Sequence, residues 1–240
     1  MVIGGFLVTS AANGFNEIIE KDLDKLMKRT ADRPLPSGRM TNGQALVLSL
    51  LMGIFGTYLL GSLNILTGLL SVFSILFYAF IYTPLKRKSP IAVFVGAIPG
   101  ALPPLIGYVA AHGFIDDVAL ILFGIQFVWQ FPHFWAIAWV LDEDYKQAGF
   151  RLLPTTKRDR VSAIVTFVST LILIPVSILP FLYGFGGYYI LIVSIIAGIL
   201  FSYQALVLVK NLDIKSAQKL MFGSFVYLPI VQLVLLFNLK

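Results

Sequence analysis

Seven long apolar stretches recur along this chain, and they restrict the possible fold more than any other feature. A helix needs about 20 apolar residues to cross a hydrocarbon core about 30 Å thick. Apolar residues make up 58% of the 240 residues and charged residues only 12%, whereas a soluble domain carries about a quarter charged residues. The sequence therefore predicts an all-α fold, a polytopic transmembrane helical bundle. We expect full spans over residues 45–60, 65–82, 91–111, 119–139, 161–183, 188–209 and 220–239.

The first twelve residues are also apolar, but they amount to only about half a span. They have neither a basic n-region nor a cleavage site, which argues against a signal peptide. We expect them to form the tail of a partial N-terminal span. No linker or low-complexity segment interrupts the chain, so residues 1–240 are expected to form a single transmembrane domain.

The basic residues alternate between the connections. Of the 18 Lys and Arg residues, 17 lie in residues 21–39, 86–88, 146–160 and 210–219, and none lies in residues 61–64, 112–118 or 184–187. By the positive-inside rule, the basic loops face the cytoplasm, which predicts a multi-pass protein of the bacterial plasma (inner) membrane. The net charge of +6 is thus explained by topology, and nucleic acid is not expected as a partner. The absence of cysteine excludes disulfides and thiolate metal sites.

An acidic motif follows the first apolar segment. Asn16, Glu20 and Asp24 are four residues apart, so they share one face of a helix, and Glu17 lies beside them. Carboxylate and amide oxygens suit Mg²⁺, which also takes water and substrate phosphates as ligands. Because the motif covers about 12 Å of helix axis, two ions or water-mediated contacts are implied. The alternative is a solvated face with i,i+4 ion pairs.

A second acidic motif closes the fourth span and adds Asp142 and Asp144 to the candidate metal ligands. Two acidic helix ends on one membrane side could hold one diphosphate between them through metal. Basic side chains near the motifs are candidates for direct diphosphate contact, because arginine pairs bidentately with phosphate and lysine acts as a point charge. These candidates are Arg29, Arg33, Lys86, Arg87, Lys146 and Arg151. The alternative is that they only set the membrane topology.

The fourth span is rich in aromatic side chains, which suit a flat ligand or a developing carbocation. An interfacial aromatic belt and core packing are the alternative. His133 lies inside the span, where a histidine is costly. It could contact a substrate, ligate a haem iron or bond to a neighbouring carbonyl. The candidates for a haem or prenyl pocket are Tyr82, Trp129, His133, Phe134 and Trp135.

Taken together, the motifs resemble those of the UbiA-type intramembrane prenyltransferases, and among them the branch that farnesylates haem. The family pattern NDxxDxxxD matches the first acidic motif, with glutamates in two aspartate positions. Further matches are RTxxRPLPxGR at residues 29–39, YT…LKR at 82–87, GAxPGAxPPLIGY at 96–108, PHFWAIA at 132–138 and DYxxAGFxLLP at 144–154. One departure is Ala92, where the family has asparagine.

The resemblance implies a UbiA-like bundle in which farnesyl diphosphate and haem b are the substrates and haem O is the product. It implies Mg²⁺ as cofactor, the lipid bilayer as surroundings, and haem A synthase or oxidase assembly proteins as partners. Since a vinyl group needs no deprotonation to attack, no general base is assigned. The family has nine transmembrane helices, so this chain is expected to lack the first and part of the second.

Two other functions are open from the residues alone. The same diphosphate machinery could prenylate an aromatic quinone precursor. A transporter or lipid-binding membrane protein is the non-enzymatic alternative, although transporters place their charged sites near the membrane midplane.

Overall fold

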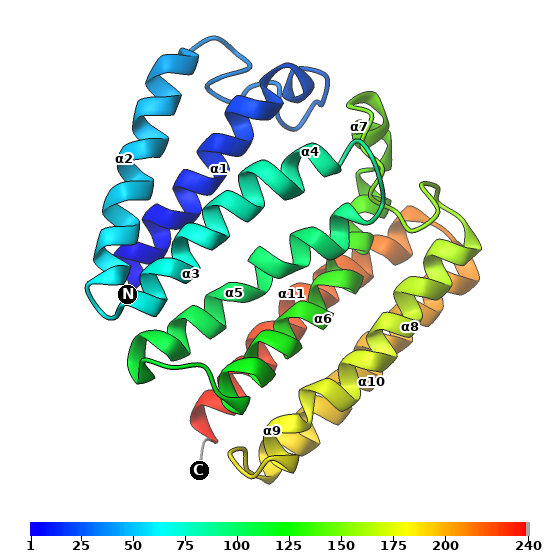
Figure 1. Ribbon diagram of the computed structural model, residues 1–240. Helices are drawn as coiled ribbons and strands as arrows, with labels where there is room; N and C mark the ends of the chain where they lie inside the picture. Colours follow the sequence, from blue (N-terminus) through cyan, green and yellow to red (C-terminus); the bar gives the residue numbers. More distant parts are fainter. Residues whose placement is uncertain (239–240) are drawn as a thin grey trace. The chain divides into compact units, whose positions relative to one another are not determined.

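The computed structural model describes residues 1–238, and every regular element in them is a helix (Figure 1). Residue 239, the expected end of the last span, lies outside the described residues. The elements are α1 (Val2–Asp24), α2 (Asn42–Gly61), α3 (Ile65–Leu76), the π-helix η1 (Phe77–Tyr82), α4 (Thr83–Leu85), α5 (Ala92–His112), α6 (Asp117–Val140), α7 (Asp142–Gln147), α8 (Arg160–Ser177), α9 (Leu179–Leu182), α10 (Tyr188–Asn211) and α11 (Ile214–Phe237).

Within the described residues, eight helical segments are long and apolar enough to cross a membrane. Seven of them correspond to the expected spans, and α3, η1 and α4 together form one of these. The eighth is α1, which corrects the expected partial span: the helix does not end near residue 12 but continues to Asp24. The acidic motif therefore occupies the last turns of a spanning helix. Charged residues lower the hydropathy there, which is why the sequence pattern ended too early.

Side-chain caps fix where several of these helices begin. Asp116, Asp159 and Asp213 each accept a hydrogen bond from a backbone N–H three residues later, at the starts of α6, α8 and α11. Such caps satisfy donors that the first turn leaves unpaired. The hydrogen bond from the Ser162 backbone, together with one from Thr155, holds the pKa of the Asp159 carboxyl below its usual range. The cap at Asp213 also starts α11 six residues before the expected position, in a turn where lysines mask the apolar pattern.

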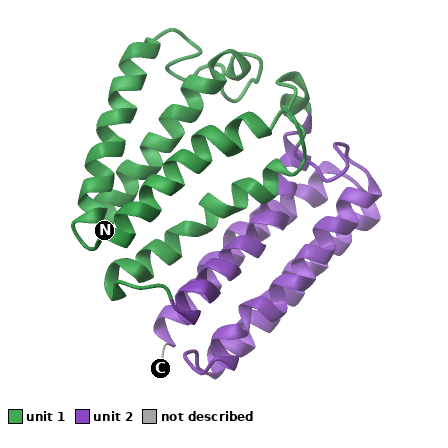
Figure 2. Cartoon of the chain, viewed as in Figure 1, with its two compact units in different colours: residues 1–115, 143–151 green, residues 116–142, 152–240 purple. Residues whose placement is uncertain are grey.

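The chain divides into two compact units (Figure 2). The first comprises residues 1–115 and 143–151, and the second comprises residues 116–142 and 152–240. In the first unit, α1 packs against α2 and α3, and α5 packs against α3 and η1. In the second unit, α6, α8, α10 and α11 form a ring in which each helix packs against two others.

Glycines bring α1 and α2 into close contact. A Cβ atom on Gly56 of α2 would lie 2.9 Å from the backbone N of Val8 and 3.0 Å from the carbonyl O of Gly4. These are backbone atoms of α1, which cannot move aside as a flexible side chain can. By contrast, a Cβ atom on Gly53, one turn earlier, would meet its nearest neighbours at 3.5 Å, an ordinary contact distance.

We expect Gly56→Ala to destabilise the protein and Gly53→Ala to leave it equally or more stable. Both changes improve helix propensity by up to about 1 kcal/mol, but only the first forces α1 and α2 apart, and overpacking typically costs about 1–3 kcal/mol. The midpoint of thermal unfolding in detergent, followed by circular dichroism, measures the difference. Equal unfolding midpoints for Gly56→Ala and Gly53→Ala would contradict the close contact of α1 and α2 at Gly56.

Candidate active site

The acidic motif forms a buried face on the last three turns of α1. Asn16, Glu20 and Asp24 are only 7%, 4% and 1% exposed, whereas Glu17 on the neighbouring face is half-buried. The amide of Asn16 donates to Glu20 Oε2 at 2.8 Å and to Thr83 Oγ1 of α4 at 3.0 Å. Acidic side chains buried this deeply are not a solvated helix face, so they need partners or a bound cation.

The segment after α1 folds back and brings an arginine to this face. Thr30 donates its hydroxyl to the carbonyl O of Asp24 at 2.9 Å, which closes the turn. Arg33 then reaches Asp24 Oδ2 with Nη1 at 2.9 Å, and its Nε lies 3.6 Å from Glu17 Oε1. The guanidinium thus joins two carboxylates of the motif.

Lys86, which directly follows α4, neutralises the Glu20 carboxylate of the motif. Lys86 Nζ donates to Glu20 Oε2 at 2.6 Å, and both side chains are buried. The ammonium also lies 5.2 Å from the ring centre of Tyr82 and 5.1 Å from that of Phe150, within the range of cation–π attraction. Burial lowers the pKa of Lys86 below its usual value, and the neighbouring Glu20 carboxylate opposes that shift.

The π-helical turn η1 sets the position of Tyr82 and Lys86. Such turns insert an extra residue into a helix and occur often at functional sites. The ring of Tyr82 lies directly over Gly96 of α5, where a Cβ atom would come within 2.6 Å of Cε2 of the ring. Any larger residue at position 96 would displace Tyr82 and, with it, the surroundings of the Lys86 ammonium.

A pocket of about 470 Å³ opens beside Glu20. Thr83, Arg87 and Lys88 are among its lining residues, so an acid and two cations border the same space. Arg87 is exposed and, among the described residues, forms no ion pair with an acid of the motif, in contrast to Lys86. This pocket gives an anionic group direct access to Glu20.

The remaining basic candidates of the first unit are exposed: Arg29, Lys146 and Arg151. Arg151 is tied to the site through its backbone, since its N–H donates to the carbonyl O of Lys86 at 2.8 Å. Arg29 lies near Tyr145 of α7, whose pKa is raised by burial while the positive charge of Arg29 acts in the opposite direction. Asp144, the neighbour of Tyr145, is half-buried.

Asp142 belongs to the second unit, where it is buried and lies 3.5 Å from Arg158 Nε. Arg158 also donates to the carbonyl O of Trp139 at 2.7 Å. The guanidinium therefore caps the end of α6 and holds the first carboxylate of the second acidic motif in place. The role of Arg158 could not be predicted from the sequence, because no spacing rule connects positions 142 and 158.

The aromatic candidates of α6 form a cluster in the second unit. His133 stacks on Trp129 with ring centres 4.2 Å apart and meets Phe134 edge-on at 5.4 Å. Its Nδ1 lies 2.8 Å from Ser224 Oγ, and that hydroxyl donates its only hydrogen to the carbonyl O of Met221. With this hydroxyl orientation, Nδ1 of a neutral ring would be the donor to Ser224, and Nε2 would be an acceptor.

Two other members of the expected pocket lie outside this cluster. Trp135 packs against Phe131, with ring centres 5.5 Å apart. Tyr82 belongs to the first unit, where it contacts Lys86 as described.

The first acidic motif suits Mg²⁺ only if water and substrate phosphates supply some of the ligands. In residues 1–238, no three His, Cys, Asp or Glu side chains gather closely enough to hold a metal ion by themselves. Glu20 Oε1, however, is buried without a hydrogen-bond partner. A bare buried carboxylate oxygen is costly, and it suits an ion that completes its shell with water and substrate phosphates. The donor set therefore fits Mg²⁺ brought together with a diphosphate.

Similarity to known proteins identifies the family of this chain. The sequence profile of the UbiA prenyltransferase family matches residues 1–228. The chain belongs to the UbiA prenyltransferase family. It is thus a member of a family of membrane-embedded transferases, as its motifs indicated, and the expected all-helical membrane fold is confirmed.

Curated relatives in this family cover nearly the whole chain. A protein of Cytophaga hutchinsonii named protoheme IX farnesyltransferase is 53% identical over 234 residues, which are 97% of this chain and 82% of that protein. A protein of Flavobacterium psychrophilum with the same name is 45% identical over 239 residues, covering 98% of this chain and 79% of that protein.

Solved structures share the UbiA fold. A structure concerned with digeranylgeranylglyceryl phosphate synthase superposes with a TM-score of 0.79 at 25% identity, covering 98% of this chain and 83% of that one. A UbiA homologue from Archaeoglobus fulgidus, bound to GPP and Mg²⁺, superposes with a TM-score of 0.63 at 13% identity, covering 98% and 88%.

Proposed function

We propose that this chain transfers a farnesyl group from farnesyl diphosphate to a vinyl group of haem b, with loss of diphosphate. Water then adds to the resulting cation and gives the hydroxyl of haem O. The observation that carries the proposal is the buried acidic face of α1, joined by Lys86 and Arg33, in a chain whose relatives are named protoheme IX farnesyltransferase. An acidic face bordered by cations is the arrangement that a metal-bound diphosphate requires.

The acidic motifs would hold the cofactor. Asn16, Glu17, Glu20 and Asp24 of the first motif are assigned to Mg²⁺, and the sequence pattern adds Asp142 and Asp144 of the second. When bound, Mg²⁺ would neutralise the charge that builds up on the leaving diphosphate. Its presence in the Archaeoglobus fulgidus homologue together with GPP supports this assignment.

The basic residues divide into two groups by their present contacts. Lys86 and Arg33 are paired with acids, so they fix the carboxylates and share their charge with an arriving diphosphate. The exposed residues can reach the diphosphate without breaking a buried pair: Arg29, Arg87, Lys146 and Arg151. Preorganised positive charge stabilises the departing anion most effectively where water is excluded.

The aromatic cluster of α6 is assigned to the acceptor. Trp129 and Phe134 of this cluster are proposed to contact haem or prenyl, and so are Trp135 and Tyr82, which lie outside it. His133 keeps Nε2 unprotonated, so it can bind the haem iron or accept a hydrogen bond. No residue acts as a general base, because the attacking vinyl group carries no proton that must leave first.

The surroundings follow from the sequence. We assign the protein to the bacterial plasma membrane, with the acidic motifs and basic loops on the cytoplasmic side by the positive-inside rule. The family profile runs through both compact units, which supports the proposal that residues 1–240 form one prenyltransferase domain. Haem A synthase or oxidase assembly proteins would receive the haem O.

Deuterated farnesyl diphosphate distinguishes this reaction from the alternatives. The purified protein receives it together with haem b and a hydroxybenzoic acid, and mass spectrometry locates the label. We expect labelled haem O, unlabelled benzoic acid and release of diphosphate. Label on the benzoic acid would instead indicate a quinone-pathway prenyltransferase, and no diphosphate release would favour a transporter.

A further inference from the structure

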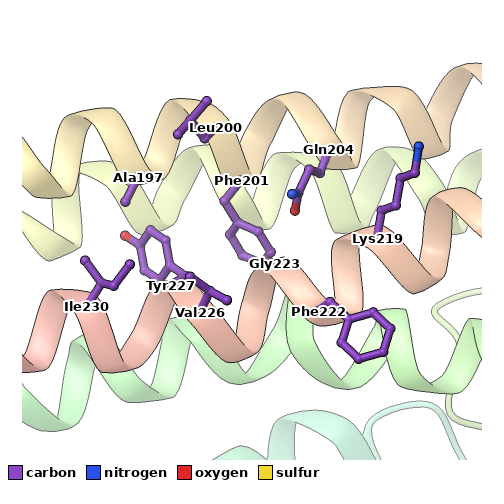
Figure 3. Close-up of a pocket in the computed structure, with 10 residues that line it drawn as sticks. All are labelled: Ala197, Leu200, Phe201, Gln204, Lys219, Phe222, Gly223, Val226, Tyr227 and Ile230. Carbon is purple, nitrogen blue, oxygen red and sulfur yellow. The ribbon is translucent and has the colours of Figure 1, made fainter.

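A groove lies between α10 and α11, and none of its lining residues is assigned to the reaction (Figure 3). Its volume is about 470 Å³. Phe201 and Tyr227 form its buried floor, while Leu200 and Val226 on the rim are exposed. Both helices are membrane-spanning segments, so this groove opens on a surface that contacts lipid.

The length of the groove matches one leaflet of a bilayer. Its lining runs along α11 from Lys219 to Ile230, which corresponds to about 17 Å of helix axis. Half of a hydrocarbon core is about 15 Å thick. A lipid chain lying along the helices would therefore fill the groove from one membrane surface to about the midplane.

Two polar side chains of the groove lie at one end, whereas the hydroxyl of Tyr227, near Ala197, donates to Ser177. Figure 3 shows Lys219 and Gln204 together, far from Ala197 and Ile230. Among the lining residues that the structure describes, Lys219 is the only charged one. The oxygen Oε1 of Gln204 is buried and has no hydrogen-bond partner. An unpaired amide oxygen in an apolar groove is costly, which points to a ligand that supplies the missing partner.

Charge at this end favours an anionic headgroup. Lys210 in the last turn of α10 and Lys215 in the first turn of α11 precede Lys219 in the sequence, and between residues 210 and 219 the only acid is Asp213. Each lysine near an anionic lipid surface strengthens the attraction. One lysine inside the groove suits a singly charged phosphodiester, and a diphosphate would need more cations.

We propose that the α10–α11 groove is a binding site for one anionic phospholipid. The phosphate pairs with Lys219, Gln204 Oε1 accepts a hydrogen bond from a headgroup hydroxyl, and one acyl chain lies over Phe201 and Tyr227. Gly223 makes room for this arrangement, because a Cβ atom there would collide with the Gln204 side chain. The site is independent of the proposed reaction.

Native mass spectrometry of the whole chain, released from detergent with added phosphatidylglycerol or phosphatidylcholine, tests the proposal. We expect one phosphatidylglycerol to bind more tightly than phosphatidylcholine. Lys219→Gln should weaken phosphatidylglycerol binding about fivefold and leave phosphatidylcholine unaffected. Gly223→Leu fills the floor and should remove both lipids. Lys157→Gln, an exposed change elsewhere in the same unit, should alter neither.

Three results would overturn the proposal. The first is equal affinity for the two lipids, and the second is unchanged phosphatidylglycerol binding by Lys219→Gln. The third is a lipid-free dimer that Gly223→Leu dissociates, which would assign the groove to a second copy of the chain. Lys219 is exposed, so its variant gives a decisive answer even if Gly223→Leu does not fold.

Discussion

Replacing Asp24 with asparagine should lower the rate of farnesyl transfer by about 10²–10³-fold while the protein stays folded. Asparagine has the same shape and its oxygen can still accept from Arg33, so the turn after α1 is preserved. It lacks the charge that a divalent cation requires. We also expect the Mg²⁺ concentration for half-maximal rate to rise.

Asp22→Asn is the matched control. Asp22 lies two residues away on the same helix, its side chain is 88% exposed, and within residues 1–238 it pairs only with Lys25. Initial rates of both variants over a series of Mg²⁺ concentrations give the comparison. If Asp24→Asn works as fast as Asp22→Asn, or if turnover survives Glu20→Ala together with Asp24→Ala, the metal assignment is wrong.

Replacing Lys86 with methionine should both destabilise the protein and abolish most turnover. Methionine fills the space of the lysine stem but leaves the Glu20 carboxylate buried without its counter-charge. Removing one partner of a buried ion pair typically costs about 3–5 kcal/mol. The midpoint of thermal unfolding in detergent should therefore fall clearly below that of the unaltered protein.

Adding Glu20→Gln to Lys86→Met separates folding from chemistry. The double variant has no buried charge at this point, so we expect most of the lost stability to return. Turnover should stay low, because a metal ligand and a cation are both missing. A double variant no more stable than Lys86→Met alone would show that the pair does not govern the stability of this region.

The acidic face could be predicted from the sequence because it depends only on helix periodicity. Asn16, Glu20 and Asp24 are four residues apart, and the structure does bury all three on one face. The extent of the helix was less predictable. The hydropathy of the sequence falls at the first charged residues of α1, so the apolar pattern ends before the helix does. A spanning helix can nevertheless carry a polar face when other elements cover it.

The partners of this face could not be predicted from the sequence. Thr83 lies 67 residues from Asn16, which it contacts, and Lys86 lies 66 residues from its partner Glu20. Their direction depends on the π-helical turn before them, which has no reliable sequence signature. The motif YT…LKR contains both residues, so the sequence marked them as candidates. It did not show which residues of the acidic motif they contact. The Arg158–Asp142 pair was missed for the same reason.

Mass spectrometry of haems tests the central claim most directly. Membranes containing this chain receive haem b and farnesyl diphosphate, with Mg²⁺ or with a chelator that removes it. We predict that haem O appears with Mg²⁺ and disappears with the chelator. Haem O formed equally in both conditions would contradict the role of the acidic face, and no haem O with Mg²⁺ present would contradict farnesyl transfer to haem.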